Sequence, residues 1–221
     1  MAAKDYWEFV EDFFGTGVIT ATQADDNMWR AVLTGTTPTV ARVTPSSSGE
    51  VELTNTATEE AQVATLYQSD ILQFDIDKIK EVHFRVKMNQ AALTSGSVVA
   101  FGVIGNHNAD VDAIAQSVLF QVTAATSTTL VYCASDDGTA ETAPTSTGVA
   151  LINAYKDFLI SFAEGTDDIR FFIDGVPVLT GTTFDMSNYT GSLQLWAQCQ
   201  KASSTNTDEI TIDRISINGV R

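Results

Sequence analysis

The chain has 221 residues, and 28 acidic residues against 12 lysines and arginines give it a formal net charge of −16. A surface this negative repels nucleic-acid phosphates and anionic membranes, and no apolar run reaches the roughly 20 residues of a spanning helix, so we expect neither partner. The composition is rich in Thr, Val, Ile and Phe and poor in Pro, which is typical of an all-β protein.

The first 15 residues leave two structures open. Aromatic residues from Tyr6 onward have helical spacing, whereas Glu11–Phe14 also fits a strand. We therefore divide the chain into residues 1–15, an N-terminal arm or first strand, and residues 16–221, a single sandwich domain. Tyr6 and Trp7 precede any strand assignable to that domain, so we expect them to bind a partner, with packing over one end of the sandwich as the alternative.

Alternation of apolar and polar residues predicts the strands. Val82–Met88 is the clearest case and places His83, Arg85 and Lys87 on an outer face. The same pattern recurs along the chain at Glu50–Leu53, Leu119–Val122, Leu130–Cys133, Phe158–Phe162, Ile169–Ile173, Leu193–Cys199 and Ile210–Ile217.

Turn residues separate these runs. Asp174-Gly175 predicts a two-residue hairpin turn, because Gly tolerates a positive φ angle. Pro177 lacks an amide donor and indicates an edge strand, a place where copies of the chain could associate. The polar segment Ser135–Gly148 is expected to be an exposed, mobile loop. Phe171 is expected to face the core, opposite to Phe172.

One loop carries hard oxygen ligands at every second position, at Asn106, Asn108, Asp110 and Asp112. This spacing is similar to the first half of a calcium loop, but the glycine of the sharp turn and the distal glutamate are missing. We expect a solvated acidic loop and no cofactor, with Ca²⁺ as the alternative. His107 in the same loop is expected to be exposed.

Three segments carry a resemblance to a known family. Glu11–Gly15 followed by Trp29 is similar to the opening of many concanavalin A-like lectin/glucanase domains, which include the laminin-G-like domains. Ile169–Gly175 resembles their Phe-Tyr-Val-Asp-Gly hairpin, and Ile210–Ile217 resembles the closing strand that returns beside the first. The resemblance implies a two-sheet antiparallel jelly-roll sandwich with minimal helix.

The chain also resembles jelly-roll proteins of tailed-phage virions. That resemblance implies a non-enzymatic virion structural protein, a capsid decoration or cement protein that binds the major capsid protein or another virion protein as a homo-oligomer. We expect it to be made in the host cytoplasm without a signal peptide and to reside in the virion.

Two other functions remain open. Gln194, Trp196 and Gln198 share one strand face, opposite to an apolar face, and could form a sugar-binding surface of a lectin-like module. A divergent glycan hydrolase or lyase would need two catalytic carboxylates or an Arg/His group. Glu50 with Glu52 and His83 with Arg85 are the nearest candidates, and we expect ordinary surface residues at both places.

The two cysteines fall in apolar strand patterns. Cys133 and Cys199 are therefore expected to be buried, inert thiols. A bridge between them would require neighbouring strands.

Overall fold

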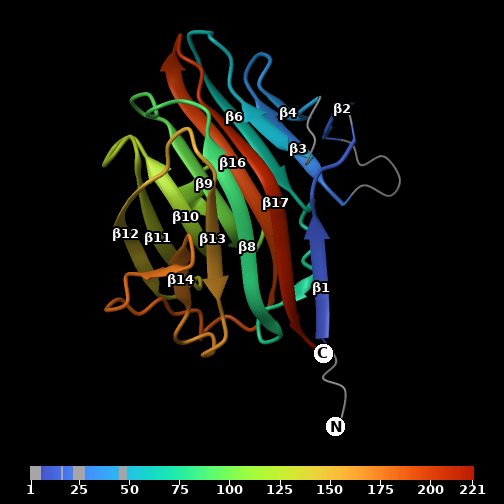
Figure 1. The fold of residues 1–221 in the computed structure, drawn as a ribbon, viewed down its shortest axis with the longest axis vertical. Coiled ribbons are helices and arrows are strands. Elements are labelled where there is room, and N and C mark those ends of the chain that lie inside the picture. Colours follow the sequence, from blue (N-terminus) through green and yellow to red (C-terminus); the bar gives the residue numbers. More distant parts are fainter. Residues whose placement is uncertain (1–5, 16, 22–27, 45–48) are drawn as a thin grey trace.

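The computed structural model describes residues 6–15, 17–21, 28–44 and 49–221. Two antiparallel sheets face each other, which confirms the predicted jelly-roll sandwich (Figure 1). The nine-stranded sheet contains β1 (Tyr6–Glu11), β2 (Gly17–Val18), β4 (Thr39–Arg42), β5 (Val51–Thr54), β8 (Ile79–Met88), β13 (Lys156–Ser161), β14 (Arg170–Ile173), β15 (Val176–Val178) and β17 (Glu209–Val220). The eight-stranded sheet contains β3 (Arg30–Thr34), β6 (Glu60–Tyr67), β7 (Phe74–Asp75), β9 (Val98–Ile104), β10 (Ser117–Thr123), β11 (Leu130–Asp136), β12 (Glu141–Ala150) and β16 (Ser192–Ser204).

Helix is minimal in the described part of the chain. A single 3-10 turn, η1 (Val111–Ala113), follows the Asp110 cap, whose side chain accepts the Asp112 N–H. No helix among the described residues is long and apolar enough to cross a membrane.

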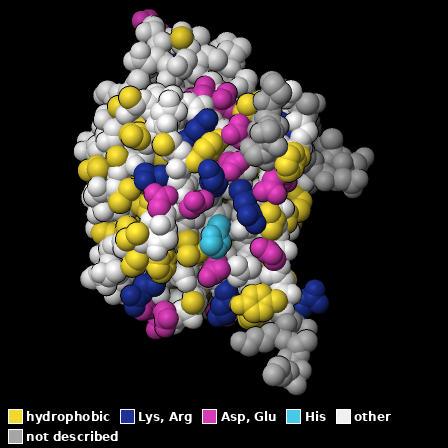
Figure 2. Space-filling model, in the orientation of Figure 1, with side chains coloured by type: hydrophobic (Ala, Val, Ile, Leu, Met, Phe, Trp, Pro, Cys, Tyr) yellow, Lys and Arg dark blue, Asp and Glu magenta, His cyan; other side chains and the backbone are white. Residues whose placement is uncertain are grey.

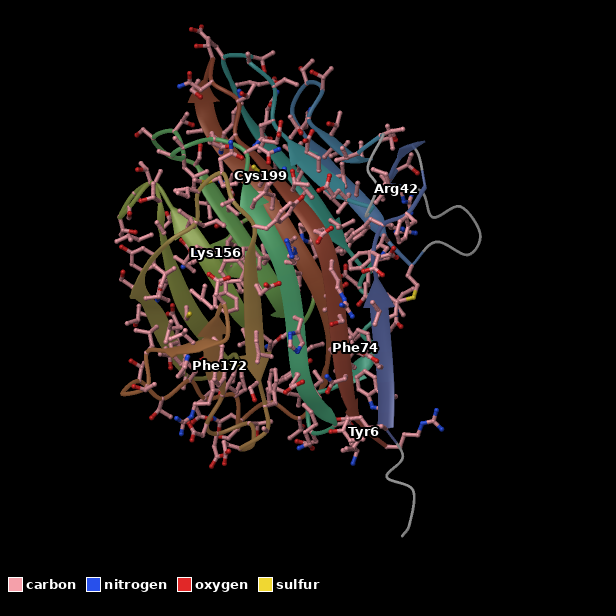
Figure 3. The ribbon with its side chains drawn as sticks, in the orientation of Figure 1. Tyr6, Arg42, Phe74, Lys156, Phe172 and Cys199 are labelled. Carbon is pink, nitrogen blue, oxygen red and sulfur yellow. The ribbon has the colours of Figure 1, made fainter. Side chains whose placement is uncertain are left out.

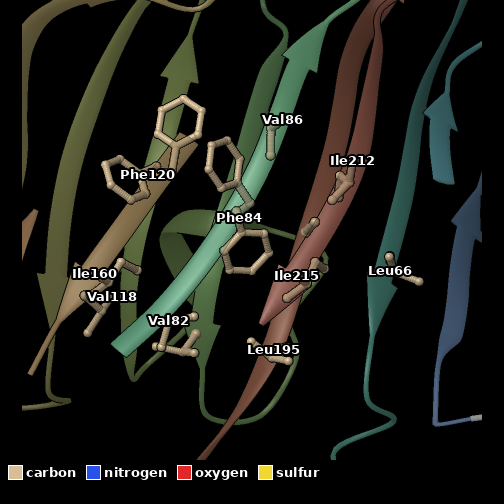
Figure 4. Packing of buried hydrophobic residues seen from close by; sticks show 14 of the residues in the cluster. Leu66, Val82, Phe84, Val86, Val118, Phe120, Ile160, Leu195, Ile212 and Ile215 are labelled. Atoms are coloured by element: carbon tan, nitrogen blue, oxygen red, sulfur yellow. The ribbon is translucent and has the colours of Figure 1, made fainter. Parts of the chain in front are cut away.

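The core lies between the two sheets. Inward side chains of β8, β13 and β17 meet those of β9, β10 and β16, and Figure 4 shows Phe84, Phe120 and Leu195 in this layer. Phe120 packs edge-on against Phe171, with ring centroids 4.9 Å apart. Phe171 is 1% exposed while Phe172 is half-buried on the other face, so the predicted orientation of this strand is confirmed. Burial of this continuous apolar layer is the main force that holds the sheets together.

The predicted strand Ile169–Ile173 and the turn that follows it are also observed. β14 and β15 pair through the Asp174-Gly175 turn, in which both residues have positive φ angles, 51° and 74°. β15, with Pro177, forms one edge of the nine-stranded sheet. His83, Arg85 and Lys87 lie on the outer face of β8, as the alternation predicts.

The expectation of a mobile loop at Ser135–Gly148 was wrong. Residues 130–136 and 141–150 form β11 and β12, which pair as an antiparallel hairpin with two register shifts. The small Thr, Ala and Ser residues that suggested a loop belong to an edge strand with one mostly exposed face. Strand pairing supplies the order that local composition did not indicate.

The N-terminal segment is a strand rather than a helix. β1 pairs with β17 over the whole of Tyr6–Glu11, and residues 1–5 lie outside the described residues. The pairing places β1 beside the closing strand, in agreement with the resemblance of Ile210–Ile217. Figure 3 labels Tyr6 and Phe74 near the same end of the sandwich.

Both cysteines are buried and free. Cys133 lies on β11 and Cys199 on β16, with β10 and β9 between them. The intervening strands rule out a bridge, and burial raises the pKa of both thiols.

Candidate functional site

The outer face of the eight-stranded sheet provides the floor of the candidate site. Strand register aligns Tyr132, Gln121, Ala100, Gln198 and Thr65 in one row across β11, β10, β9, β16 and β6. Because side chains alternate along each strand, all five point away from the core. Amide, hydroxyl and aromatic groups are thereby brought together from strands far apart in the sequence.

The loop between β9 and β10 covers one half of this face. Gln194 donates to the Gly105 carbonyl at 2.7 Å, and Gln198 donates to the Ala109 carbonyl at 3.0 Å. Val111 and Ile114 of the loop are buried against Trp196 in a second, smaller apolar cluster. The loop is therefore bound to the sheet by polar and apolar contacts.

The predicted exposure of the sugar-binding set was wrong. Gln194, Trp196 and Gln198 do share one face, but each has a relative exposure of 0%. Strand alternation correctly gave the face and could not show that the loop 105–114 lies over it. In this structure the three side chains hold the loop and do not meet solvent.

His107 contacts this covered half of the face. Its Nδ1 accepts a hydrogen bond from Trp196 Nε1 at 3.2 Å, and its ring lies 4.9 Å from the Tyr67 ring. The expectation of an exposed loop histidine was therefore wrong. Burial lowers the pKa of His107, with the charge of Asp70 acting in the opposite direction. Only the unprotonated Nδ1 can accept the indole hydrogen, so this contact requires the neutral ring.

The other half of the face remains open as a groove of about 590 Å³. The β9–β10 loop forms one wall and the edge strand β12 forms the other. The groove is lined by side chains that include Asp110, Asp112, Gln121, Thr123, Tyr132, Glu141, Pro144 and Gln200. A smaller hollow of about 40 Å³ continues it toward Ser135 and Asp136.

Gln121 is a polar residue on the floor of the groove. It is 5% exposed and makes no side-chain hydrogen bond with any described residue. The amide atoms are not among the buried, unpartnered atoms of the described residues, so they reach the groove, where they can donate and accept hydrogen bonds. Sequence reasoning missed Gln121, although the alternation at Leu119–Val122 already places it opposite to the core residue Phe120. Its side chain is available to a ligand.

Carboxylates stand along the rim of the groove. Asp110 and Asp112 belong to the loop, and Glu141 lies on β12, where it is the Cα partner of Asp136. No lysine or arginine is among the residues that line either hollow. The groove is thus negatively charged as well as polar.

The oxygens proposed for Ca²⁺ shape the loop. Asn108 Oδ1 accepts the Asp110 N–H at 3.0 Å, and Asp110 Oδ1 accepts the Asp112 N–H at 3.2 Å. Short side chains that bond to the backbone two residues on form turns of this kind. Within the described ranges, no three His, Cys, Asp or Glu side chains cluster in a way that could hold a metal ion.

Solved structures of other proteins share the fold of this chain. No family model matches the chain, and no curated protein matches it in sequence. A family 16 glycoside hydrolase (GH16) of Bacteroides ovatus, in complex with its G4G4G3G product, matches with a TM-score of 0.65 over 95% of this chain and 99% of that chain, at 12% identity. The Emp47p carbohydrate recognition domain matches with a TM-score of 0.61 over 100% and 99%, at 9% identity. The Crh5 transglycosylase in complex with NAG matches with a TM-score of 0.60 over 97% and 84%, at 15% identity.

The chain has the concanavalin A-like jelly-roll fold. The expectation drawn from Glu11–Gly15, Trp29 and the two later segments is thereby confirmed. Identities this low concern the fold, and one fold hosts many functions, so the function has to be argued from the groove.

Tyr6 and Trp7, the predicted partner-binding residues, lie in β1, the first strand of the jelly roll. Trp7 stacks on Phe74 with centroids 5.5 Å apart and donates from Nε1 to the Val220 carbonyl at 3.1 Å. Trp7 therefore packs against the sandwich, as in the alternative reading, and does not form a free arm. Tyr6, on the opposite face of the same strand, is 59% exposed. Its role in partner binding stays a prediction.

The candidate carboxylate pair lies on the outer face of the nine-stranded sheet. Glu50 accepts a hydrogen bond from the Tyr155 hydroxyl, and Glu52 accepts one from Asn89 at 3.1 Å. Burial, together with the neighbouring Glu52 carboxylate, raises the pKa of Glu209 to about 7. The partners of these two carboxylates are thus the neutral Tyr155 and Asn89 and the acidic Glu209.

The candidate His83 and Arg85 pair also lies on this face, beside a polar hollow of about 300 Å³. His83 lies 3.4 Å from Glu81, and Arg85 lies 2.9 Å from Asp213. Figure 2 shows the face, where basic and acidic side chains intermingle. Charges here are largely matched, in contrast to the groove on the opposite sheet.

Proposed function

We propose that the protein binds carbohydrate in the groove on the outer face of its eight-stranded sheet. The observation that carries this proposal is Gln121, a 5% exposed carboxamide on the groove floor without a side-chain hydrogen-bond partner among the described residues. A sugar hydroxyl both donates and accepts, and so can satisfy both ends of such an amide.

The surrounding groups fit the same ligand class. Tyr132 supplies an aromatic ring and a hydroxyl, and Gln200 supplies an amide whose Oε1 accepts a hydrogen bond from Gln198 at 3.3 Å. A volume of about 590 Å³ lies within the range of small-molecule sites. Mixed apolar and amide surface of this kind suits sugar rings, which have apolar faces and polar edges.

The test is a glycan array followed by calorimetry on Gln121→Leu. Losing one or two hydrogen bonds should weaken binding of any array hit by about tenfold to a hundredfold. Stability should change little, because the Gln121 side chain makes no hydrogen bond with any described residue and leucine is of similar size. Gln73→Leu, at an exposed position outside the groove, is the matched control and should bind like the parent.

Two outcomes would overturn the proposal. One is the absence of any carbohydrate hit for the folded parent chain. The other is a hit that Gln121→Leu binds as tightly as the parent does.

The proposed role is binding without turnover. Asp110 Oδ1 accepts the Asp112 N–H and helps to set the loop conformation, which is the role assigned to this carboxylate. Incubation of an array hit with the protein should return the oligosaccharide intact. Shortened or transferred products, detected by mass spectrometry, would show an enzyme instead.

The capsid-decoration role inferred from the sequence stays a prediction. It would be supported if the protein co-sediments with assembled phage heads and binds a major capsid protein as an oligomer. The role would be refuted if the protein stays monomeric and binds none of the phage head preparations. A glycan-binding groove is compatible with either outcome.

A further inference from the structure

The groove differs from the hollow on the nine-stranded sheet in its charge, because His83, Arg85 and Arg214 help to line that hollow, whereas no basic side chain lines the groove. On the nine-stranded sheet, Arg85 pairs with Asp213 and Lys156 pairs with Asp174. In the groove, none of the carboxylates on the rim forms an ion pair with any described residue, and no basic side chain lines the hollow. Asp110, Asp112 and Glu141 therefore face the groove without a protein counter-charge.

This charge has a consequence for the ligand. Carboxylates gathered around a hollow repel an anion and attract a cation. Asp110, Asp112 and Glu141 are exposed to solvent, so salt screens this attraction. A uronic acid would bring a further negative charge into the groove. A sugar with an ammonium group would neutralise part of the charge already there.

Gln121 shows that charge alone does not describe the site. Its unpartnered amide, 5% exposed on the floor, calls for a ligand with hydroxyl or amide groups as well as positive charge. A simple polyamine has no oxygen atom that could accept a hydrogen bond from the N–H groups of the Gln121 amide. A hexosamine with a free amino group offers both the hydroxyls and the cation.

We infer, on the basis of the carbohydrate binding proposed above, that the groove selects glycans with free amino groups, such as de-N-acetylated hexosamine chains. Neutral chains of the same backbone bind more weakly, and uronic acid chains are rejected. Gln121 and Tyr132 contact the sugar, while Asp112 and Glu141 contribute the charge that distinguishes it.

The experiment compares three tetrasaccharides at pH 6 by calorimetry: glucosamine, N-acetylglucosamine and galacturonate. In 20 mM NaCl the glucosamine tetramer should bind at least tenfold more tightly than the acetylated one, and the galacturonate tetramer should not bind. At 500 mM NaCl the tenfold gap should shrink, since added salt screens the rim charges.

Variants separate the groove from the general negative charge of the chain. Asp112→Asn combined with Glu141→Gln should lower the affinity for glucosamine at least fivefold more than the affinity for N-acetylglucosamine. Asp77→Asn, which removes one exposed charge outside the groove, should leave both affinities at the parent value. Spermine serves as a cation without hydroxyl groups and should bind more weakly than the glucosamine tetramer.

The outcomes distinguish the two proposals. If none of these sugars nor any array glycan binds, the proposed function fails, and this inference fails with it. If N-acetylglucosamine binds as tightly as glucosamine, or the double variant keeps the parent preference, the inference is overturned while carbohydrate binding stands. Spermine binding as tightly as the glucosamine tetramer, with the same dependence on Asp112 and Glu141, would also overturn it.

Discussion

Lys201→Met should lower the free energy of unfolding by about 3 kcal/mol, because the Lys201 ammonium organises one end of the sandwich. The side chain has a relative exposure of 0%. Its Nζ donates to the carbonyl oxygens of Thr58 at 2.9 Å, Ser204 at 2.8 Å and Asn206 at 3.2 Å, and also to that of Thr56. Thr56 and Thr58 lie in the loop between β5 and β6, whereas Ser204 ends β16 and Asn206 follows it. The ammonium therefore ties these two segments together.

The magnitude follows from opposing effects. Hydrogen bonds to a charged group contribute about 1.5 kcal/mol each at the low end of their range, so three donated protons give about 4 to 5 kcal/mol. Methionine recovers about 1 to 2 kcal/mol, since it avoids the cost of desolvating the ammonium and fills similar space with apolar atoms. The balance is a loss of about 3 kcal/mol, which arises from carbonyl groups left without their donor.

Urea denaturation at pH 7, followed by tryptophan fluorescence and by circular dichroism, measures the effect. Lys156→Met is the matched control. Lys156 pairs at 2.7 Å with Asp174, whose side chain is 46% exposed, and surface pairs of this kind contribute less than about 1 kcal/mol. A Lys201→Met loss no larger than that of Lys156→Met would refute the reasoning.

Three further predictions concern other groups. Glu209→Gln should be more stable than the parent by about 1 kcal/mol at pH 8 and equal to it at pH 4. The reason is the raised pKa of Glu209: the folded state keeps a proton beside Glu52, and this proton is lost as pH rises through about 7. Urea titrations at the two pH values measure the difference, and a variant less stable than the parent at pH 8 contradicts the prediction. The lowered pKa of His107 means that the unfolded chain takes up the proton more readily as pH falls below about 6.5, so acidification should lower the stability of the parent and change its tryptophan fluorescence. His107→Gln keeps an acceptor but does not titrate, so it should lose this part of the response. An unaltered response in the variant argues against the contact between His107 and Trp196. Phe171→Ala should cost about 3 to 5 kcal/mol in thermal or urea unfolding, since the 1% exposed ring would leave a cavity, and a cost under 1 kcal/mol would show that the core collapses around it.

The fold was predictable because the period of two is strong in several strands. Val82–Met88 alternates strictly and buries one apolar face. In Ile210–Ile217 the alternation is interrupted after Ile212, and a register shift in the pairing with β8 keeps Ile215 and Ile217 in the core. Segments that become strands only by pairing with an adjacent strand were not predictable from this alternation. Ser135–Gly148 is polar and small, yet it contains the end of β11 and most of β12, which pair with each other, because register on an existing strand is a tertiary property.

The site was less predictable than the fold, and Trp196 shows why. The alternation of β16 correctly assigns Trp196 to the face opposite the core, but burial there depends on a loop from another part of the chain. Gln121 follows the same alternation on β10 and remains unpartnered, since the loop stops short of it. Sequence pattern gives the face of a side chain, whereas the course of distant loops decides whether it meets solvent.

The position of β17 bears on how this protein folds during synthesis. β17 pairs with β1, β5 and β8, and the bond from Trp7 to Val220 joins residues 213 positions apart. While a ribosome still encloses the closing strand, β1 and β5 lack the neighbour that links them to β8. Contacts of such long sequence separation slow folding. Until β17 has paired, the chain exposes unpaired strand edges, and such edges favour aggregation.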